Sequence, residues 1–259
     1  MKTERLVTPC NNPYPGFRLL CGVRAGLALA AVALVMPAQA AGGHHAVDDA
    51  NMLDEGQCKL EVWAERETGG ARTLLHGGPG CRVGPVELDV NVDREKFTGM
   101  NGATSFSPQV KWATSLNEQL AVGLVVGLRF NNQSPRYVGS TLYIPVTWRA
   151  GDTLSVHANW GRDFQQTGPN QALGGLALEW APVADWSFIA ERFLQSGSSS
   201  ARVGVRWAFK PGLSLDISRA RTLGPSGPSW TTVGVNWQFG GASKPADVAA
   251  AGPGPSRTP

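Results

Sequence analysis

The sequence predicts an all-β protein, a closed antiparallel transmembrane β-barrel of about twelve strands. Three observations predict this fold. Apolar and polar residues alternate from residue 57 to residue 239, short and longer connections alternate along the chain, and tryptophans gather near strand ends. Charged residues make up 17% of the 259 residues, below the roughly 25% of ordinary soluble domains.

The alternation has a period of two, which is typical of strands with one apolar and one polar face. It is clearest over residues 120–130, where large apolar residues occupy every even position. Residues 86–93, 201–209 and 213–218 show the same pattern. A soluble β-sandwich would also alternate, so this pattern alone does not select a membrane barrel.

The connections favour the barrel. Short turns are expected near residues 115–119, 149–152, 181–185 and 210–212, and longer polar links at 95–103, 131–136, 163–170, 195–200 and 220–229. The two kinds alternate strictly. Outer-membrane barrels combine tight periplasmic turns with longer extracellular loops in this way.

The tryptophans are expected to form two belts at the membrane surfaces, because amphipathic rings collect at headgroup level. Six lie beside a short turn or at the end of the last strand: Trp112, Trp148, Trp180, Trp186, Trp207 and Trp237. Trp160 and Trp230 lie at the opposite ends of their strands. The alternative, the core of a soluble sandwich, gives no reason to sort tryptophans by strand end.

Counting hairpins gives about twelve strands, with ten or fourteen as alternatives because Gly77-Gly78-Pro79-Gly80 interrupts the second. The expected strands are 57–67, 71–83, 86–94, 104–113, 119–130, 137–148, 153–162, 171–180, 186–194, 201–209, 213–219 and 230–239. With an even number of strands, both mature termini are expected on the periplasmic side.

The first forty residues predict a cleaved secretory signal. Basic residues precede an apolar stretch at 25–36, and Ala38-Gln39-Ala40 has the small-x-small form that precedes a cleavage site, although the cut could fall elsewhere. The stretch is too short to span a bilayer as a helix, which argues against an anchor. The chain then divides into a signal peptide (1–40), a periplasmic N-terminal segment (41–56), the barrel (57–239) and an Ala-, Gly- and Pro-rich tail (240–259) expected to be disordered.

Cys58 and Cys81 are expected to form a disulfide, since an exported protein meets an oxidising compartment. Gly69-Gly70 predicts a two-residue hairpin turn, and pairing outward from that turn opposes Trp63 to His76 and then Cys58 to Cys81. The alternative is two free thiols, which would follow if the glycine-rich stretch slipped the register.

The last strand, residues 232–239, resembles the C-terminal recognition strand of bacterial outer-membrane β-barrel proteins, with Gly234, Trp237 and Phe239 at the glycine, hydrophobic and aromatic positions. The resemblance implies a Gram-negative outer-membrane protein that the barrel-assembly machinery recognises through this strand. The family usually ends at the aromatic residue, whereas this chain continues to Pro259.

His44 and His45, with Asp48 and Asp49 nearby, are candidate ligands for copper, nickel or zinc on a flexible periplasmic segment. If the mature chain began at Gly42, Gly42-Gly43-His44 would form an amino-terminal copper and nickel site. The alternative is a solvated linker, in which case no cofactor is expected.

Nine charged residues are expected to face the lumen: Glu87, Asp89, Asp93, Lys111, Arg129, Glu179, Arg202, Arg206 and Asp216. They could line a polar path for a small polar solute or form a salt-bridge lattice that fills the barrel, and the sequence leaves both open.

A passive channel or small-solute transporter in contact with outer-membrane lipid is therefore expected first, and a metal-handling barrel second. A lipid-modifying enzyme is disfavoured because His157 and His76 have no serine two positions away. The net charge of +3 gives no support for nucleic-acid binding.

Overall fold

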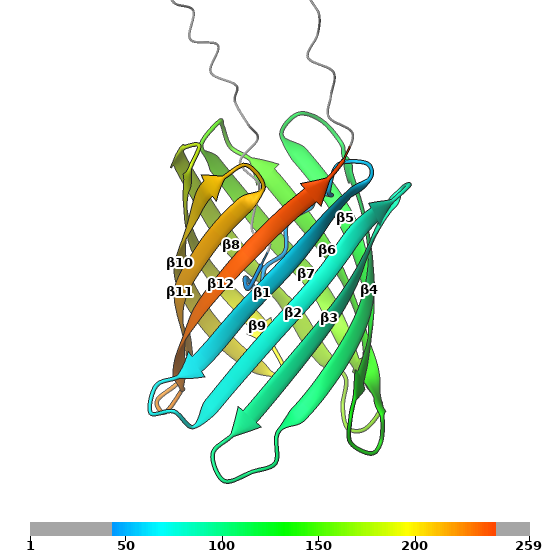
Figure 1. Cartoon of the computed structure of the whole chain (residues 1–259), viewed down its shortest axis with the longest axis vertical. Coiled ribbons are helices and arrows are strands. Elements are labelled where there is room, and N and C mark those ends of the chain that lie inside the picture. The colour runs from blue at the N-terminus through cyan, green and yellow to red at the C-terminus, as the bar shows by residue number, and fades with distance from the viewer. Residues whose placement is uncertain (1–42, 242–259) are drawn as a thin grey trace, which may run out of the picture. The chain divides into compact units, whose positions relative to one another are not determined.

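A computed structural model describes residues 43–241, and the proposed signal peptide and the tail beyond residue 241 lie outside the described part. The described chain forms one closed antiparallel barrel (Figure 1). Its twelve strands are β1 Gln57–Glu67, β2 Arg72–Val83, β3 Val86–Phe97, β4 Ala103–Ser115, β5 Leu120–Asn131, β6 Tyr137–Arg149, β7 Leu154–Gln165, β8 Gln171–Val183, β9 Trp186–Gln195, β10 Ser198–Lys210, β11 Leu213–Thr222 and β12 Ser229–Gly240.

Each strand pairs with its chain neighbours, and β1 closes the barrel against β12, with Cys58 opposite Phe239 and Glu67 opposite Trp230. The expected barrel is confirmed, and ten or fourteen strands are ruled out. Gly77-Gly78-Pro79-Gly80 stays within β2 and keeps one register against β1 throughout. The closed sheet leaves no open strand edge, as a membrane interior requires.

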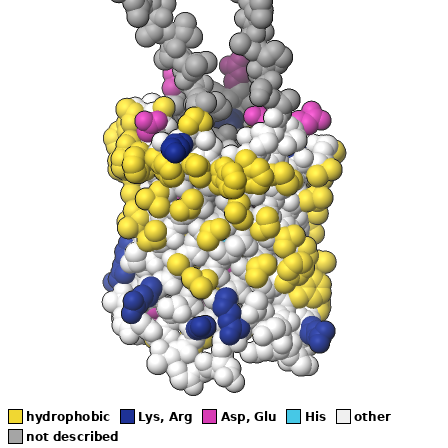
Figure 2. Space-filling view, in the orientation of Figure 1, with side chains coloured by type: hydrophobic (Ala, Val, Ile, Leu, Met, Phe, Trp, Pro, Cys, Tyr) yellow, Lys and Arg dark blue, Asp and Glu magenta, His cyan; other side chains and the backbone are white. Residues whose placement is uncertain are grey.

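The alternation places apolar side chains on the outer surface and polar ones inside. Along β5, Leu124, Val126 and Leu128 are exposed, whereas Ala121 and Val125 are buried. Figure 2 shows apolar side chains spread over the outer wall. No helix in residues 43–241 is long and apolar enough to cross a membrane.

Six tryptophans form an outward belt near the end of the barrel at which β1 begins and β12 ends. We call it the turn end, because the predicted short turns lie there. They are Trp112, Trp148, Trp180, Trp186, Trp207 and Trp237, each 40–49% exposed. Trp160 also points outward. The prediction for Trp230 is wrong: its ring lines the lumen and packs against Val47, Ala177 and Phe193.

The opposite end, the loop end, has shorter connections than expected. Its links are residues 68–71, 98–102, 132–136, 166–170, 196–197 and 223–228, whereas the turn end has 84–85, 116–119, 150–153, 184–185 and 211–212. The link between β9 and β10 has two residues, so the strict alternation of short and long connections is wrong there. The strands extend further toward the loop end than their sequence pattern indicates.

Lys and Arg side chains gather on the outer wall near the loop end (Figure 2). By strand parity the outward set on β1, β3, β7, β9 and β11 is Arg66, Arg94, Lys96, Arg162, Arg192, Arg219 and Arg221. All but Arg94 are exposed. The outer wall is therefore cationic at one end and rich in tryptophan at the other.

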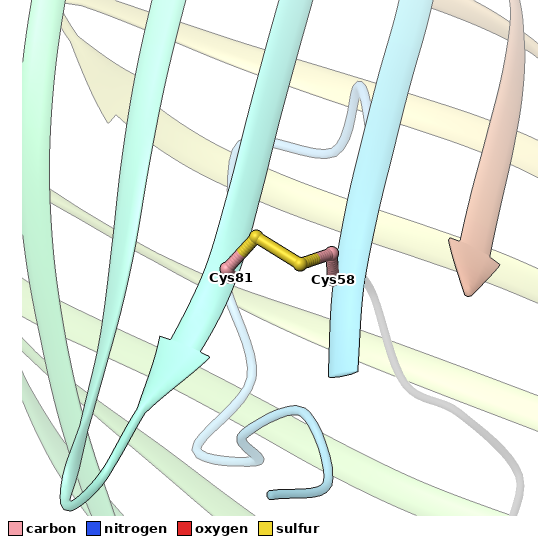
Figure 3. Close-up of a disulfide and its surroundings, with 2 residues drawn as sticks. All are labelled: Cys58 and Cys81. Atoms are coloured by element: carbon pink, nitrogen blue, oxygen red, sulfur yellow. A yellow bond between two sulfur atoms is a disulfide. The ribbon is translucent and has the colours of Figure 1, made fainter. Parts of the chain in front are cut away.

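The Cys58–Cys81 disulfide is confirmed and joins β1 to β2 near the turn end (Figure 3). The two residues are directly opposed, and Trp63 is opposed to His76, as the hairpin predicts. Gly69 and Gly70 both have positive φ, which a tight two-residue turn requires and which glycine adopts without strain. The bond closes a loop with a sequence separation of 23 residues, for which the chain-entropy argument gives roughly 3 kcal/mol of stabilisation.

Candidate functional site: the lumen and the segment inside it

Residues 43–56, which we call the inner segment, precede β1; residues 43–53 lie inside the barrel, and Asp54, Glu55 and Gly56 are exposed where the chain turns into β1 (Figure 1). Val47 is fully buried, and His44, Asp49, Ala50 and Leu53 are also buried. The expectation of a flexible, solvated linker at 41–56 is therefore wrong for residues 43–53, which the structure describes as packed inside the barrel. The segment is held by the polar inner wall, and alternation along the strands does not reveal this.

The inner segment bonds to eight of the twelve strands, so it crosses the lumen rather than following one wall. Its hydrogen bonds and ion pairs reach Glu61 on β1, Arg82 on β2, Glu87 on β3, Lys111 on β4, Thr147 on β6, Glu191 on β9, Arg202 on β10 and Ser218 on β11. Most of these partners are buried, which strengthens such bonds.

Glu191 is the main anchor of the first half of the segment. Its carboxylate accepts hydrogen bonds from the backbone N–H groups of Ala46, at 3.1 and 3.2 Å, and Val47, at 2.9 Å. It also pairs with Arg202 at 3.2 Å, and Arg202 donates to the carbonyl of His44. The carboxylate is thus satisfied by one charged partner and two amides, as a buried charge must be.

Asp48 anchors the middle of the segment. One carboxylate oxygen pairs with Lys111 Nζ at 3.0 Å, and the other accepts a hydrogen bond from the Tyr143 hydroxyl at 3.2 Å. Further along, the N–H of Ala50 donates to Thr147 Oγ1 at 2.9 Å, and the N–H of Leu53 donates to Glu87 Oε2 at 3.1 Å.

All nine charged residues assigned to the lumen point into the barrel, and each has a partner there. The pairs are Lys59 with Glu87 and Asp89, His76 with Asp93, Lys111 with Asp48, Arg129 with Asp163, His157 with Glu179, Arg202 with Glu65 and Glu191, and Arg206 with Asp216. The pairs around the inner segment make a salt-bridge lattice in the turn half of the lumen.

The loop half of the lumen holds a cavity of about 1000 Å³, which we call the vestibule. Gly43, His44, His45, Ala46 and Asp48 line it from the inner segment, and residues from the loop-end connections such as Thr167, Pro169 and Ser196 line its mouth. The inner segment is therefore the floor of a chamber that opens at the loop end.

The vestibule wall is rich in carboxylates, with eight Asp and Glu side chains against five Lys and Arg side chains. The acidic residues are Asp48, Glu61, Glu65, Glu67, Asp89, Asp93, Glu95 and Asp163, and the basic residues are Lys59, Arg72, Lys111, Arg129 and Arg202. An excess of one sign in a low-dielectric chamber attracts ions of the other sign. By formal charge the lining of the chamber is therefore net acidic.

His157 lies in a relay of a hydroxyl, an imidazole and a carboxylate that the sequence did not indicate. Thr147 Oγ1 lies 2.9 Å from His157 Nδ1, and His157 Nε2 lies 3.3 Å from Glu179 Oε2. All three side chains are at most 2% exposed. The Thr147 hydroxyl is buried and therefore not accessible to a lipid substrate. It accepts a hydrogen bond from the N–H of Ala50, so these three side chains help to hold the inner segment.

His44 and His45 stack with ring centroids 4.5 Å apart and reach the wall at β11, where Asp216 lies. His44 Nε2 lies 2.7 Å from Ser218 Oγ. Burial, then repulsion from His45, Arg202 and Arg206, lowers the pKa of His44 far below its usual range, so its imidazole is neutral. Residue 42, on which the proposed amino-terminal metal motif depends, lies outside the described residues.

Two glycines let the segment approach the wall here. Gly43 has a φ of +79°, and a Cβ there would lie 2.6 Å from Asn236. Gly234 on β12 faces inward, and a Cβ there would lie 2.8 Å from that of Trp63 and 3.6 Å from His44 Nδ1. Gly234 thus has a packing role inside the barrel, whereas Trp237 and Phe239 are exposed on its outer face.

Sequence reasoning missed the residues that hold the segment, chiefly Glu191, Tyr143 and Thr147, and Glu65, which pairs with Arg202. Glu191 could have been found, because it lies on the polar face of the expected strand 186–194. Glu65 likewise lies on the inward face of 57–67. The amide partners of Glu191 come from the inner segment, and no short spacing marks them. Glu65 acts on the segment only through Arg202, since its own partners are Arg72, Arg202 and Thr232.

Comparison with known proteins agrees with this architecture. Solved structures described as "KdgM porin" and "NanC porin structure in rhombohedral crystal form" match 70% of this chain and 99% and 100% of their own, with TM-scores of 0.59 and 0.58 and 12% identity each. At this identity the likeness concerns the fold alone. No curated protein sequence matches the chain.

A family model described as "Uncharacterised conserved protein UCP029691" matches residues 29–239, which include every strand of the barrel except the last residue of β12. The match covers well over half of the chain. The chain belongs to this family, uncharacterised conserved protein UCP029691.

Proposed function

We propose that this protein is an outer-membrane channel for small cationic or neutral solutes, closed in the present conformation by its own inner segment. One observation carries the proposal: residues 43–56 cross the lumen beneath a vestibule of about 1000 Å³ that opens at the loop end. A barrel built only as a scaffold would have no need for a chamber lined with charges.

The distribution of residues on the outer wall supports one orientation in the outer membrane, with the loop end outside and both ends of the barrel sequence on the periplasmic side. Seven outward Lys and Arg side chains near the loop end suit a leaflet of anionic, phosphate-bearing lipid, where long cationic side chains reach headgroups. The belt of six tryptophans suits the opposite interface. Outer-membrane lipid is then the first partner of the barrel.

The charge of the vestibule determines the proposed solute class. One solved structure with a similar fold is described as "KdgM porin in complex with disordered oligogalacturonate", with a TM-score of 0.57 and 11% identity. Oligogalacturonate is a polyanion, whereas carboxylates outnumber Lys and Arg side chains in this vestibule. We therefore assign cationic or neutral solutes to this chain.

The last strand supports a second partner. β12 closes the barrel against β1 and carries Trp237 and Phe239 outward, 4.5 Å apart between ring centroids. An exposed aromatic pair on the closing strand is available to the barrel-assembly machinery before closure, as the resemblance of this strand implies.

The channel proposal is tested by recording currents across planar bilayers from the full-length protein and from an in-frame deletion of residues 43–50. We expect the full-length protein to stay mostly closed. The deletion removes the bonds to Glu61, Glu191, Arg202 and Ser218, and we expect at least a tenfold larger mean current with a reversal potential that shows cation preference.

A deletion of the same length in the tail, residues 244–251, is the matched control and should leave the current of the full-length protein unchanged. Folding of each variant is checked by the heat-dependent shift of its gel mobility. A folded 43–50 deletion that carries no current would contradict the channel proposal, because the lumen would then be filled by the wall itself.

A further inference from the structure

Three potential metal ligands meet at the vestibule floor, two from the inner segment and one from the barrel wall. His44, His45 and Asp216 each offer one ligand atom, and these atoms all lie within 4.8 Å of one another. The side chains of all three residues are buried. Adjacent residues on an extended segment rarely direct both side chains to one place, but here the rings are stacked toward β11.

The two imidazoles are incompletely satisfied. The side chains of His44 and His45 are each 1% exposed, and both Nδ1 atoms are buried without a hydrogen-bond partner. His44 Nδ1 lies 3.8 Å from Asp216 Oδ2, and His45 Nδ1 lies 3.7 Å from Glu191 Oε1. These separations are too long for hydrogen bonds, and a buried polar atom without a partner is costly. An ion between these groups would satisfy both nitrogens.

Neighbouring residues already hold the ligands in place, as outer-shell residues do in metal sites. Ser218 Oγ lies 2.7 Å from His44 Nε2, which fixes that ring and leaves Nδ1 directed at Asp216. Arg206 holds both oxygens of Asp216, with Nε donating to Oδ1 at 2.7 Å and Nη2 to Oδ2 at 2.8 Å. Oδ2 also accepts a hydrogen bond from the Asn236 amide at 2.7 Å, and it is the oxygen 3.8 Å from His44 Nδ1. The positive charges nearby are balanced, because Arg202 pairs with Glu65 and Glu191 and Arg206 pairs with Asp216.

An ion can reach this place from outside. His44 and His45 line the vestibule, whose walls carry more carboxylates than Lys and Arg side chains. Such a chamber concentrates divalent cations above its floor. Three protein ligands also leave one position of a tetrahedral ion for water or another ligand.

We propose that His44, His45 and Asp216 bind one divalent transition-metal ion, of the zinc, copper or nickel type, at the floor of the vestibule. Two imidazoles and one carboxylate suit these ions, whereas calcium and magnesium prefer sets made of oxygen alone. Ligand atoms about 2.0–2.1 Å from a tetrahedral ion lie roughly 3.3 Å apart, so the ion draws the three groups together. Because two ligands come from the inner segment and one from β11, the bound ion ties the segment to the wall. The site does not depend on whether the barrel conducts.

The test uses the full-length protein, purified in detergent without a polyhistidine tag and stripped with a chelator. Titration with Zn²⁺ by calorimetry, and with Co²⁺ by visible absorption, should give one ion per chain. The double variant His44→Ala/His45→Ala should lose at least tenfold in affinity and lose the Co²⁺ absorption bands. His76→Ala is the matched control, since His76 lines the same vestibule but pairs with Asp93, and its titration should match that of the unchanged protein.

Asp216→Asn keeps the length of the side chain and removes the anionic ligand, so it should also weaken binding by at least tenfold. This variant separates the proposed site from a site made by the chain terminus with His44, which would not need Asp216. Asp216→Asn also provides a test of the metal site if the double variant fails to fold. Absence of bound ion in the unchanged protein, or unchanged affinity in the folded double variant or in Asp216→Asn, would overturn the proposal. None of these outcomes depends on a current measurement, so the test of metal binding and the test of the channel proposal can fail independently of each other.

Discussion

Replacement of Glu191 by alanine should raise the mean current through the barrel by a factor on the order of ten to one hundred. Glu191 is 4% exposed, accepts the N–H groups of Ala46 and Val47 and pairs with Arg202. Hydrogen bonds to charged groups contribute about 1.5–3 kcal/mol each, and a tenfold change in an equilibrium corresponds to about 1.4 kcal/mol. Loss of two such bonds therefore shifts the inner segment strongly toward a displaced state.

We expect a smaller rise in mean current than the summed free energies of these hydrogen bonds would give, because other contacts still hold the inner segment. Arg202 still donates to the carbonyl of His44 and pairs with Glu65, and Asp48 keeps Lys111 and Tyr143. Glu67→Ala is the control, since Glu67 lines the vestibule but makes no bond to the segment among the described contacts. It should alter cation preference slightly and leave the closed time unchanged. Equal currents from the Glu191→Ala and Glu67→Ala proteins would show that Glu191 does not hold the barrel closed.

Arg206→Leu should lower the free energy of unfolding by about 3–5 kcal/mol, the usual cost of removing one member of a buried ion pair. Arg206 Nε and Nη2 donate to the two oxygens of Asp216 at 2.7 and 2.8 Å, and Asp216 is fully buried. The variant leaves this carboxylate with the Asn236 amide as its nearest donor, at 2.7 Å. Urea unfolding of the protein refolded into lipid, followed by tryptophan fluorescence, measures the change.

Arg192→Leu is the matched control for that experiment, because Arg192 is exposed on the outer face of β9. Arg192 lies near the loop end, where the proposed headgroup contacts are, and a charge near the membrane interface changes stability by only about 0–1 kcal/mol. The two substitutions should therefore differ by several kcal/mol, although they make the same chemical change. A loss below about 1 kcal/mol for Arg206→Leu would show that the charge lattice of the turn half contributes little to stability.

The barrel itself could be predicted because local rules determine it. The period of two fixes which residues face lipid, and the Gly69-Gly70 turn fixes the register that opposes Cys58 to Cys81. Nine charged residues could be assigned to the lumen from parity alone. The two-residue link at 196–197 was misjudged because Ser198–Ser200 extend β10 with small polar residues that read as loop.

The contents of the lumen could not be predicted by the same means. The inner segment forms no helix or strand, and its partners lie up to 174 residues away in the sequence, as for His44 and Ser218. His44 and His45 could be named as metal ligands from their chemistry, but Asp216 could not be joined to them, because β11 meets the segment only once the barrel closes. Trp230 could have been placed by parity, since it shares the inward face of β12 with Thr232 and Gly234, and in the lumen its ring packs against Val47 of the segment.

Hydrogen exchange of the unmodified protein tests the position of the inner segment most directly. The N–H groups of Ala46, Val47, Ala50 and Leu53 donate to Glu191, Thr147 and Glu87 inside the barrel. Peptides from residues 43–56, analysed by mass spectrometry after exchange in lipid nanodiscs, should keep deuterium out of these amides for at least minutes, because exchange requires the segment to leave its bonds. Complete exchange of the segment within seconds, while the strands stay protected, would contradict a lumen closed by residues 43–56.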